Sequence, residues 1–164
     1  MCSADRTAEA HAELSSPAEA AAVLRQARAL VAHAGAAPAL MAGKQLALLS
    51  PDAGDAAAQE FMAAAKALGA RVSHVRAGLD DHSSSAQVEA TARMLGQLYD
   101  AVECQHLPPE LVARIARSAG VPVFTGLALP SHPTAALAAS LDGDATAALK
   151  RRCVLQATLL VRLG

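Results

Sequence analysis

The chain has 164 residues, of which 53% are hydrophobic, 18% are charged and only 2% are aromatic, and its formal net charge is −1. This length and composition are typical of one globular domain with a sizeable core and exclude an intrinsically disordered chain. Scarce aromatic residues and dispersed Lys and Arg argue against a nucleic-acid partner, which would need stacking platforms or a basic patch.

The first residues predict a loose segment followed by a helix. Residues 1–15 are small and polar. Ser16-Pro17-Ala18-Glu19 has the pattern of a capping box with proline at the first helical position, so we expect a helix to begin here. Gly35 is expected to end it. The apolar residues that share one face of this helix are Val23, Leu24, Ala27, Leu30, Val31 and Ala34.

Four short apolar runs predict strands at residues 45–50, 71–75, 101–105 and 121–124. The first run is almost continuously apolar, as expected for a strand that is covered on both faces. Each run is bounded by turn residues, which separates it from the helical segments.

The segments between these strands carry apolar residues at helical spacing, which predicts helices. A helix is expected from Ala56 to Gly69, a second one after a cap at Ser83 or Ser84, and a third one from residue 108 to Gly120. The apolar residues expected to point inward from these helices are Phe61, Ala65, Leu68, Val88, Ala92, Leu95, Tyr99, Leu111, Ile115 and Ala119.

The C-terminal part predicts two more helices. His132-Pro133 opens a short one, and Asp144 is expected to cap a final helix that runs to Leu163. This helix carries Lys150-Arg151-Arg152, the one basic cluster of the sequence, which we interpret as a solvated helix face. Its inward face is predicted to consist of Leu149, Cys153, Ala157 and Leu160.

Three strand–helix–strand passages in succession predict a parallel sheet with right-handed crossovers. We therefore expect one α/β domain over residues 16–164, a doubly wound fold of three layers with a four-stranded parallel sheet and helices on both faces. In such folds ligands bind at the carboxyl ends of the strands, over helix N-termini. Residues 50–58, which follow the first strand, are accordingly the expected place for a site.

The cysteines and the N-terminal segment bear on the cellular compartment. Three widely spaced cysteines suggest reduced thiols in a cytoplasm rather than a disulfide framework. The start of the chain lacks the apolar core of a signal peptide, and no apolar run is long enough to span a membrane. The residues concerned are Cys2, Cys104 and Cys153, and the polar residues Asp5, Arg6 and Glu9.

Several short fragments, in this order and spacing, resemble one family. The chain is similar, over about residues 16–140, to the N-terminal carbamoyl-phosphate-binding domain of aspartate and ornithine carbamoyltransferases, and it resembles the ornithine branch more closely. We expect the strand order 2-1-3-4. The fragments are Gly43-Lys44-x-Leu46-Ala47, Phe61, Leu68-Gly69-Ala70, Thr91-Ala92-Arg93-Met94-Leu95, Tyr99-Asp100-Ala101, Val121-Pro122-Val123, Gly126-Leu127 and His132-Pro133-Thr134.

The resemblance also shows where the chain departs from the family. The family binds carbamoyl phosphate with a Ser-Thr-Arg-Thr-Arg loop at a helix N-terminus, which suits a dianionic phosphate. Two guanidinium groups and three hydroxyl groups are absent here, and Asp52 stands nearby. The residues at the loop positions are Gly54, Asp55, Ala56, Ala57 and Ala58.

Other positions of the family's site are changed as well. The histidine of its His-Pro-x-Gln motif is retained as His132, but Ala135 replaces the glutamine. Gln105 replaces an arginine after the third strand, and Ala139 and Ala90 replace acids. A serine-rich stretch at 82–85 replaces a lysine-bearing loop of the aspartate branch, and the sequence ends where the resemblance places an amino-acid-binding domain.

Each candidate residue has a structural and a functional interpretation. Asp55 is expected to be an N-cap rather than an acid catalyst, its carboxylate capping the amides that would hold phosphate. His132 is expected to fix its loop rather than to donate to a carbonyl oxygen. Three serines at 83–85 form either a cap or an anion-binding turn. A metal site is the weaker hypothesis for Cys104, His106, His82 and His132, because Cys-x-His has no recognised ligand spacing.

We therefore expect a non-catalytic carbamoyltransferase-like domain that forms oligomers, trimers by resemblance, or binds a partner. One alternative is an enzyme, a carbamoyltransferase half-subunit completed by a separate chain. Another is a sensor of a small neutral or cationic ligand, which Asp52 and Asp55 favour. No cofactor, metal, nucleic acid or membrane is expected to bind.

Overall fold

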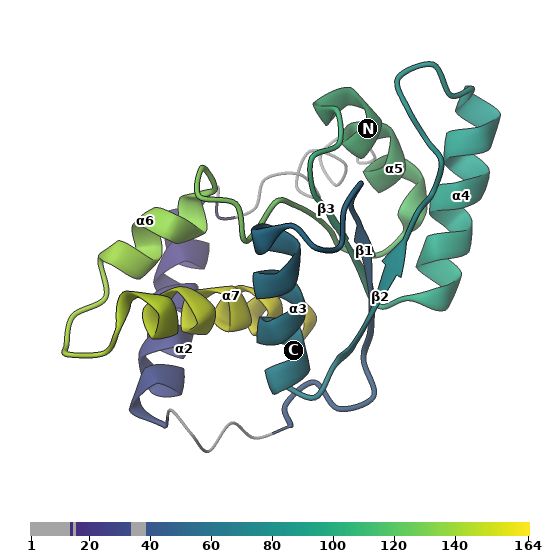
Figure 1. Ribbon diagram of the computed structural model, residues 1–164. Coiled ribbons are helices and arrows are strands. Elements are labelled where there is room, and N and C mark those ends of the chain that lie inside the picture. The colour runs from purple at the N-terminus through teal and green to yellow at the C-terminus, as the bar shows by residue number, and fades with distance from the viewer. Residues whose placement is uncertain (1–13, 15, 34–38) are drawn as a thin grey trace.

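The computed structural model describes residues 14, 16–33 and 39–164, and the rest are drawn in grey in Figure 1. The prediction of a loose segment before the first helix lies, apart from Leu14, outside the described residues and remains a prediction. The first helix ends at Ala32, with His33 as its C-cap, which is earlier than the predicted end at Gly35. Gly35 itself lies outside the described residues. The elements are α2 (Pro17–Ala32), β1 (Gln45–Leu49), α3 (Ala56–Ala67), β2 (Arg71–Val75), α4 (Ser85–Leu98), β3 (Ala101–Cys104), α5 (Pro109–Ala119), β4 (Val123–Thr125), α6 (Pro133–Ala139) and α7 (Ala147–Leu163).

The strands form one parallel sheet in the order β2-β1-β3-β4, which confirms the predicted fold class and strand order. Leu46 of β1 pairs with Val72 of β2 on one side and with Ala101 of β3 on the other. β4 begins two residues later than predicted, because Pro122 has no N–H to donate to a ladder. Its carbonyl still accepts from the Val102 amide at 3.0 Å.

The sheet is covered on both faces, as Figure 1 shows, with α4 and α5 on one face and α3 and α7 on the other. Side chains alternate along the strands between these two cores. Leu46 and Leu48 belong to the core formed with α3 and α7. Ala47 and Leu49 belong to the core formed with α4 and α5. The apolar run of β1 is therefore continuous because both faces of the strand are buried, as predicted.

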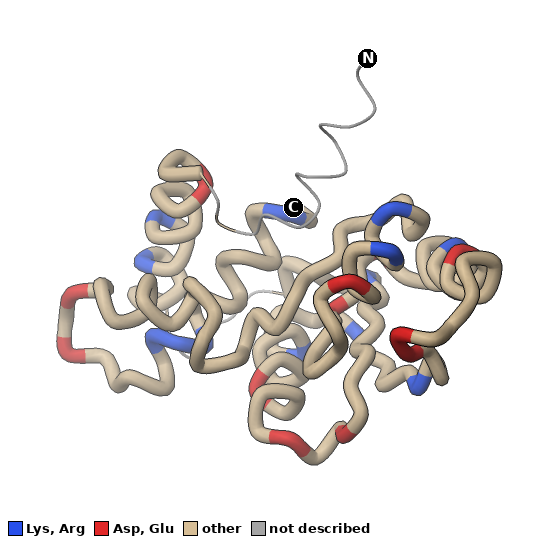
Figure 2. Tube along the Cα trace, turned by 90° about the horizontal axis from the view of Figure 1, so that it is seen from above, with Lys and Arg blue, Asp and Glu red and all other residues tan. Residues whose placement is uncertain are grey.

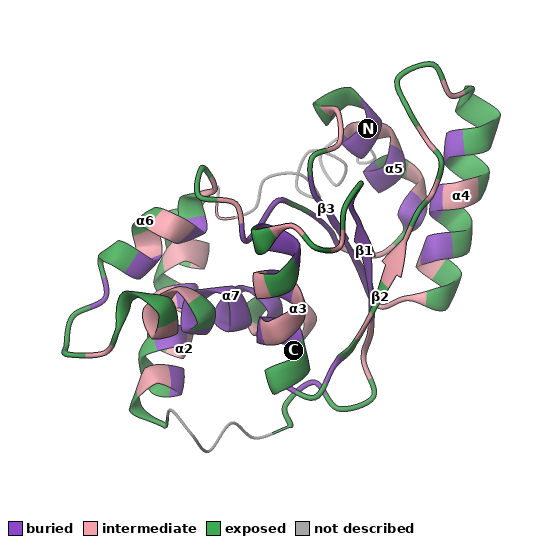
Figure 3. Cartoon of the chain, in the orientation of Figure 1, coloured by how far each residue is buried: buried purple, intermediate pink, exposed green. Residues whose placement is uncertain are grey.

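The final helix α7 is a core element rather than a peripheral one. Residues 153–159 are all buried, and the middle of α7 is correspondingly purple in Figure 3. Leu155 and Leu159 contact the core beneath the sheet, and the Gln156 amide Nε2 donates to the Ala64 carbonyl of α3 at 3.2 Å. α2 and α6 pack against α7 and form a third, smaller apolar core with it. α7 thus covers one face of the sheet together with α3.

The helix caps confirm two predictions and correct a third. The Ser16 hydroxyl accepts from the Glu19 amide at 3.1 Å. Ser84 caps α4 in a complete capping box with Gln87. The prediction that Asp144 caps the last helix is wrong, because the Thr146 hydroxyl accepts from the Leu149 amide at 3.2 Å and α7 begins at Ala147.

The charged residues are scattered along the chain trace rather than gathered on one face (Figure 2). One detail corrects the sequence analysis. Lys150-Arg151-Arg152 is not a uniformly solvated helix face, because Arg151 is half-buried and donates hydrogen bonds to two main-chain carbonyls. In the described part of the chain, no helix is long and apolar enough to cross a membrane.

Candidate functional site

The loops that follow β1 and β3 meet at the carboxyl edge of the sheet, where the site was expected. The Gln105 amide donates to the Leu49 carbonyl at 2.9 Å, so the chain after β3 stays beside the end of β1. The α3 helix begins at Ala56, directly after the β1 loop. Parallel strands bring both loops and a helix N-terminus to one place, which is the usual ligand position in such a sheet.

Asp55 caps α3, as predicted. Its carboxylate oxygen Oδ2 accepts from the Ala57 amide at 3.0 Å. The backbone of Asp55 is extended, with φ −59° and ψ 143°, which turns the side chain back over the first turn of the helix. A helix N-terminus presents unpaired amides that attract anions, and here the chain supplies that anion itself.

A second carboxylate binds the same loop. Asp52 Oδ1 accepts from the Gly54 amide at 2.8 Å, and the Asp52 carbonyl accepts from the Ser50 hydroxyl at 3.1 Å. The amides of residues 54 and 57, on either side of Asp55, are therefore both bound by carboxylates of the loop itself. Neither amide is left to bind an external phosphate in this conformation.

His106 contacts Asp55, and the sequence analysis did not predict this contact. Its Nε2 lies 3.3 Å from Asp55 Oδ2, although the two residues are 51 positions apart in the sequence. The backbone of His106 is left-handed, with φ +55°, which is uncommon for a residue other than glycine and redirects the chain after β3. Only the Cys104-x-His106 spacing drew attention to it, and that pattern suggested a metal rather than a carboxylate.

The pKa of Asp55 lies below its ordinary value of 3.8. The hydrogen bond from His106 is the largest cause, and hydrogen bonds from the Ala57 and Ala58 amides lower the pKa further, while desolvation opposes them. All of these donors stabilise the ionised carboxylate. Asp55 is therefore a carboxylate at neutral pH.

This lowered pKa predicts how the stability conferred by Asp55 depends on pH. A depressed carboxyl pKa stabilises the fold at pH above the unfolded-state value, near 3.8, and that stabilisation is lost as pH falls through the lower folded-state value. We expect Asp55→Ala to lower the urea midpoint at pH 7 and the difference from wild type to shrink at about pH 3.

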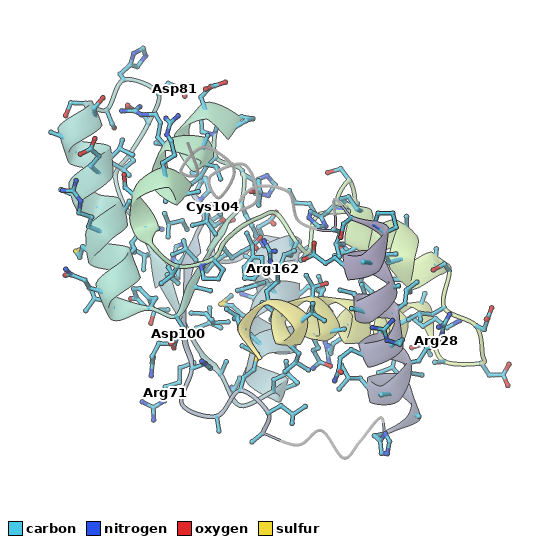
Figure 4. The ribbon with its side chains drawn as sticks, turned by 180° about the vertical axis from the view of Figure 1, so that it is seen from behind. Arg28, Arg71, Asp81, Asp100, Cys104 and Arg162 are labelled. Atoms are coloured by element: carbon cyan, nitrogen blue, oxygen red, sulfur yellow. The ribbon has the colours of Figure 1, made fainter. Side chains whose placement is uncertain are left out.

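Asp81→Ala is the matched control, since Asp81 is exposed in the loop before α4 and lies far from Cys104 and the end of β3 in Figure 4. Equal pH dependence of the two variants' midpoint differences would contradict a special role for Asp55.

Gln105 connects the end of β3 to the first turn of α3. Its side chain is fully buried, and Nε2 donates to the Ala57 carbonyl at 3.3 Å. Its Oε1 is buried without a hydrogen-bond partner among the described residues. Gln105 thus lies beside Ala56 and Ala57, at the position where the resemblance places an arginine.

His132 and Ala135 belong to α6 rather than to the α3 cluster. His132 is the N-cap of α6, and its Nδ1 accepts from the Thr134 amide at 3.1 Å. The Thr134 hydroxyl donates to the Leu127 carbonyl at 2.6 Å. The contacts agree with the prediction that His132 fixes the loop before Pro133.

The hypothesis of a metal site has no geometric support in the described part of the chain, where no group of three or more His, Cys, Asp or Glu residues could hold an ion. Cys104 is buried in the core between the sheet and α4 and α5. His106 instead faces Asp55. His82 follows Asp81, which lies away from Cys104 in Figure 4.

Sequence comparisons relate this chain to carbamoyltransferases. Residues 10–142 match the family model of the aspartate/ornithine carbamoyltransferase carbamoyl-phosphate-binding domain. Ornithine carbamoyltransferase of Neisseria lactamica is 40% identical over 81 residues, which cover 49% of this chain and 31% of that protein. The enzyme of Cutibacterium acnes is 34% identical over 109 residues, which cover 66% and 33%. The chain therefore spans about a third of the length of these relatives.

Structural comparisons also find carbamoyltransferases. Ornithine carbamoyltransferase of Gloeobacter violaceus superposes with a TM-score of 0.55 at 26% identity, covering 74% of this chain and 39% of that one. The Pyrococcus furiosus enzyme gives a TM-score of 0.63 at 24% identity, covering 78% and 42%. Aspartate transcarbamoylase of Trypanosoma cruzi gives 0.59 at 23% identity, covering 79% and 42%. The last two likenesses bear on the fold alone.

Proposed function

Because the chain belongs to the aspartate/ornithine carbamoyltransferase family, through its carbamoyl-phosphate-binding domain, we propose that it is a non-catalytic member whose phosphate site is filled by its own Asp55. The observation that carries this proposal is the hydrogen bond from the Ala57 amide to Asp55 Oδ2. An ionised carboxylate bound to that amide repels a phosphate dianion. It also occupies a hydrogen-bond donor that the dianion would need.

The free energies of the missing contacts also support the proposed loss of phosphate binding. A hydrogen bond to a charged group contributes roughly 1.5–3 kcal/mol, and each 1.4 kcal/mol changes an affinity by about tenfold. The chain has Ala56 and Ala58 where the family motif has arginines, and Gly54 where it has a serine. Losing three such contacts weakens phosphate binding by about three to six powers of ten, which is more than a typical metabolite site can lose and still bind.

The remaining role that we propose is assembly, with copies of this chain or with a partner. Two large apolar side chains one turn apart on the outer face of α4 support it, since Met94 is 46% and Leu98 60% exposed. Trimers are the assembly that the resemblance suggests. Sedimentation velocity at micromolar concentrations is expected to show a species larger than the monomer, reduced by Met94→Asp with Leu98→Asp but not by the neighbouring Gln97→Asp. A monomer at all concentrations would contradict self-association.

Isothermal titration with carbamoyl phosphate tests the loss of the site. We expect no saturable heat up to about 1 mM, the weak end of specific affinity. Transferase assays with ornithine and with aspartate are expected to give no turnover. A dissociation constant below about 1 mM would contradict the proposal.

A further inference from the structure

Arg151 is a half-buried cation that pairs with no carboxylate among the residues that the structure describes. Its guanidinium donates to three neutral oxygens, the Thr134 hydroxyl and the carbonyls of Leu127 at 3.0 Å and Leu129 at 2.9 Å. Within the described chain it makes no other polar contact. A guanidinium carries five N–H groups, so two remain for another acceptor.

Glu60 influences Arg151 but forms no ion pair with it. Glu60 acts on Arg151 only through the field of its charge, while its carboxylate lies 3.5 Å from Arg152 Nε. Arg151 is half-buried, so its guanidinium has lost part of its hydration, and this burial lowers its pKa. A partly desolvated cation gains more from a bound anion than a fully exposed one does, because the local dielectric constant is lower.

Arg151 lines a cavity of about 400 Å³ between α6 and α7, which run beside each other in Figure 1. Lys150 lines it too, and its Nζ donates to the Gly143 carbonyl at 2.9 Å, which holds the ammonium against the loop that joins the two helices. The other walls are methyl groups. The lining residues are Ala135, Ala138, Ala139, Ala147, Lys150 and Arg151.

We propose that this cavity binds a short aliphatic dicarboxylate. Two cations and no acid line it, so two negative charges match its lining, and the alanine methyl groups suit an aliphatic chain between them. Its volume falls within the range of about 300–1,000 Å³ that is usual for small-molecule sites. The proposal is independent of the α3 site, since none of the residues that line the cavity belongs to α3 or to the loop before it.

A titration of the full chain with succinate, followed by amide chemical shifts, tests this proposal. We expect saturable shifts for the amides of residues 134–151. Succinamide, which has the same shape without the charges, is expected to leave these amides unchanged. Equal shifts with succinamide, shifts spread evenly over the surface, or no shifts at all would overturn the proposal.

Two matched variants give a second readout. Ala139→Asp places a carboxylate in the lining at an exposed position, so it should leave the fold intact and weaken succinate binding at least tenfold. Ala86→Asp makes the same change at an exposed position of α4, on the other side of the sheet, and should leave binding unaltered. Equal affinity of both variants for succinate would overturn the assignment of the site.

Discussion

Replacing Gly54, Asp55 and Ala56 by Ser, Thr and Arg is expected to tighten carbamoyl phosphate binding by about a hundredfold. The change removes the carboxylate that occupies the Ala57 amide and adds a guanidinium at the N-terminus of α3. One new charge-assisted hydrogen bond contributes roughly 1.5–3 kcal/mol, and relief of the like-charge repulsion adds to it. A hundredfold corresponds to about 2.7 kcal/mol.

The three positions tolerate these side chains. Gly54 and Ala56 are exposed. A Cβ at Gly54 would approach only the Asp52 carboxylate, at 3.1 Å, which is the movable end of a side chain. Calorimetric titration is expected to show saturable carbamoyl phosphate binding by the variant and none by wild type up to about 1 mM, which sets a lower bound on the gain.

The matched control carries Gln instead of Arg at position 56, which keeps the size and removes the charge, and it should recover only a minor part of the affinity. No gain in the Arg variant, with the fold intact, would show that Asp55 and the missing guanidinium are not what excludes phosphate.

Gly96→Ala is expected to destabilise the fold by about 2 kcal/mol, the difference between an overpacking cost of about 3 kcal/mol and the gain in helix propensity of about 1 kcal/mol. Gly96 of α4 lies directly against the end of α5, and a Cβ there would stand 1.7 Å from the Ala119 carbonyl oxygen. Backbone cannot move aside as a side chain does, so α4 and α5 must separate. The better helix propensity of alanine, about 1 kcal/mol, offsets only part of this cost.

Urea unfolding measures the effect, with Gln97→Ala as the control at the next, exposed position of the same helix. The control is expected to change the free energy of unfolding by less than about 0.5 kcal/mol. Equal stability of Gly96→Ala and wild type would mean that α4 and α5 do not pack as closely as described.

The sequence predicted the elements of the fold because their patterns are local. The continuous apolar run before Ser50 and the helical spacing of Phe61, Ala65 and Leu68 each have one good explanation, and the structure buries these residues accordingly. The cap of α7 was assigned wrongly for an equally local reason. Asp144 and Thr146 are both good N-cap residues two positions apart, so sequence preference cannot choose between them.

The site was predictable only in part, because contacts across the sheet leave no local signal. The capping role of Asp55 followed from its place before an alanine-rich helix. Its contact with His106 depends on the left-handed backbone of His106 itself. Because no glycine stands at that position, the sequence does not indicate such a backbone. Arg151 looked like one member of a basic surface run, and its contacts with the Leu127 and Leu129 carbonyls, far away in the sequence, leave no local signal.

A crystal of the chain soaked in carbamoyl phosphate tests the central claim most directly. The account predicts that the Ala57 amide still donates to Asp55 Oδ2, with no phosphate density over residues 54–58. Phosphate bound to the amides of these residues, with the Asp55 side chain turned away, would contradict it.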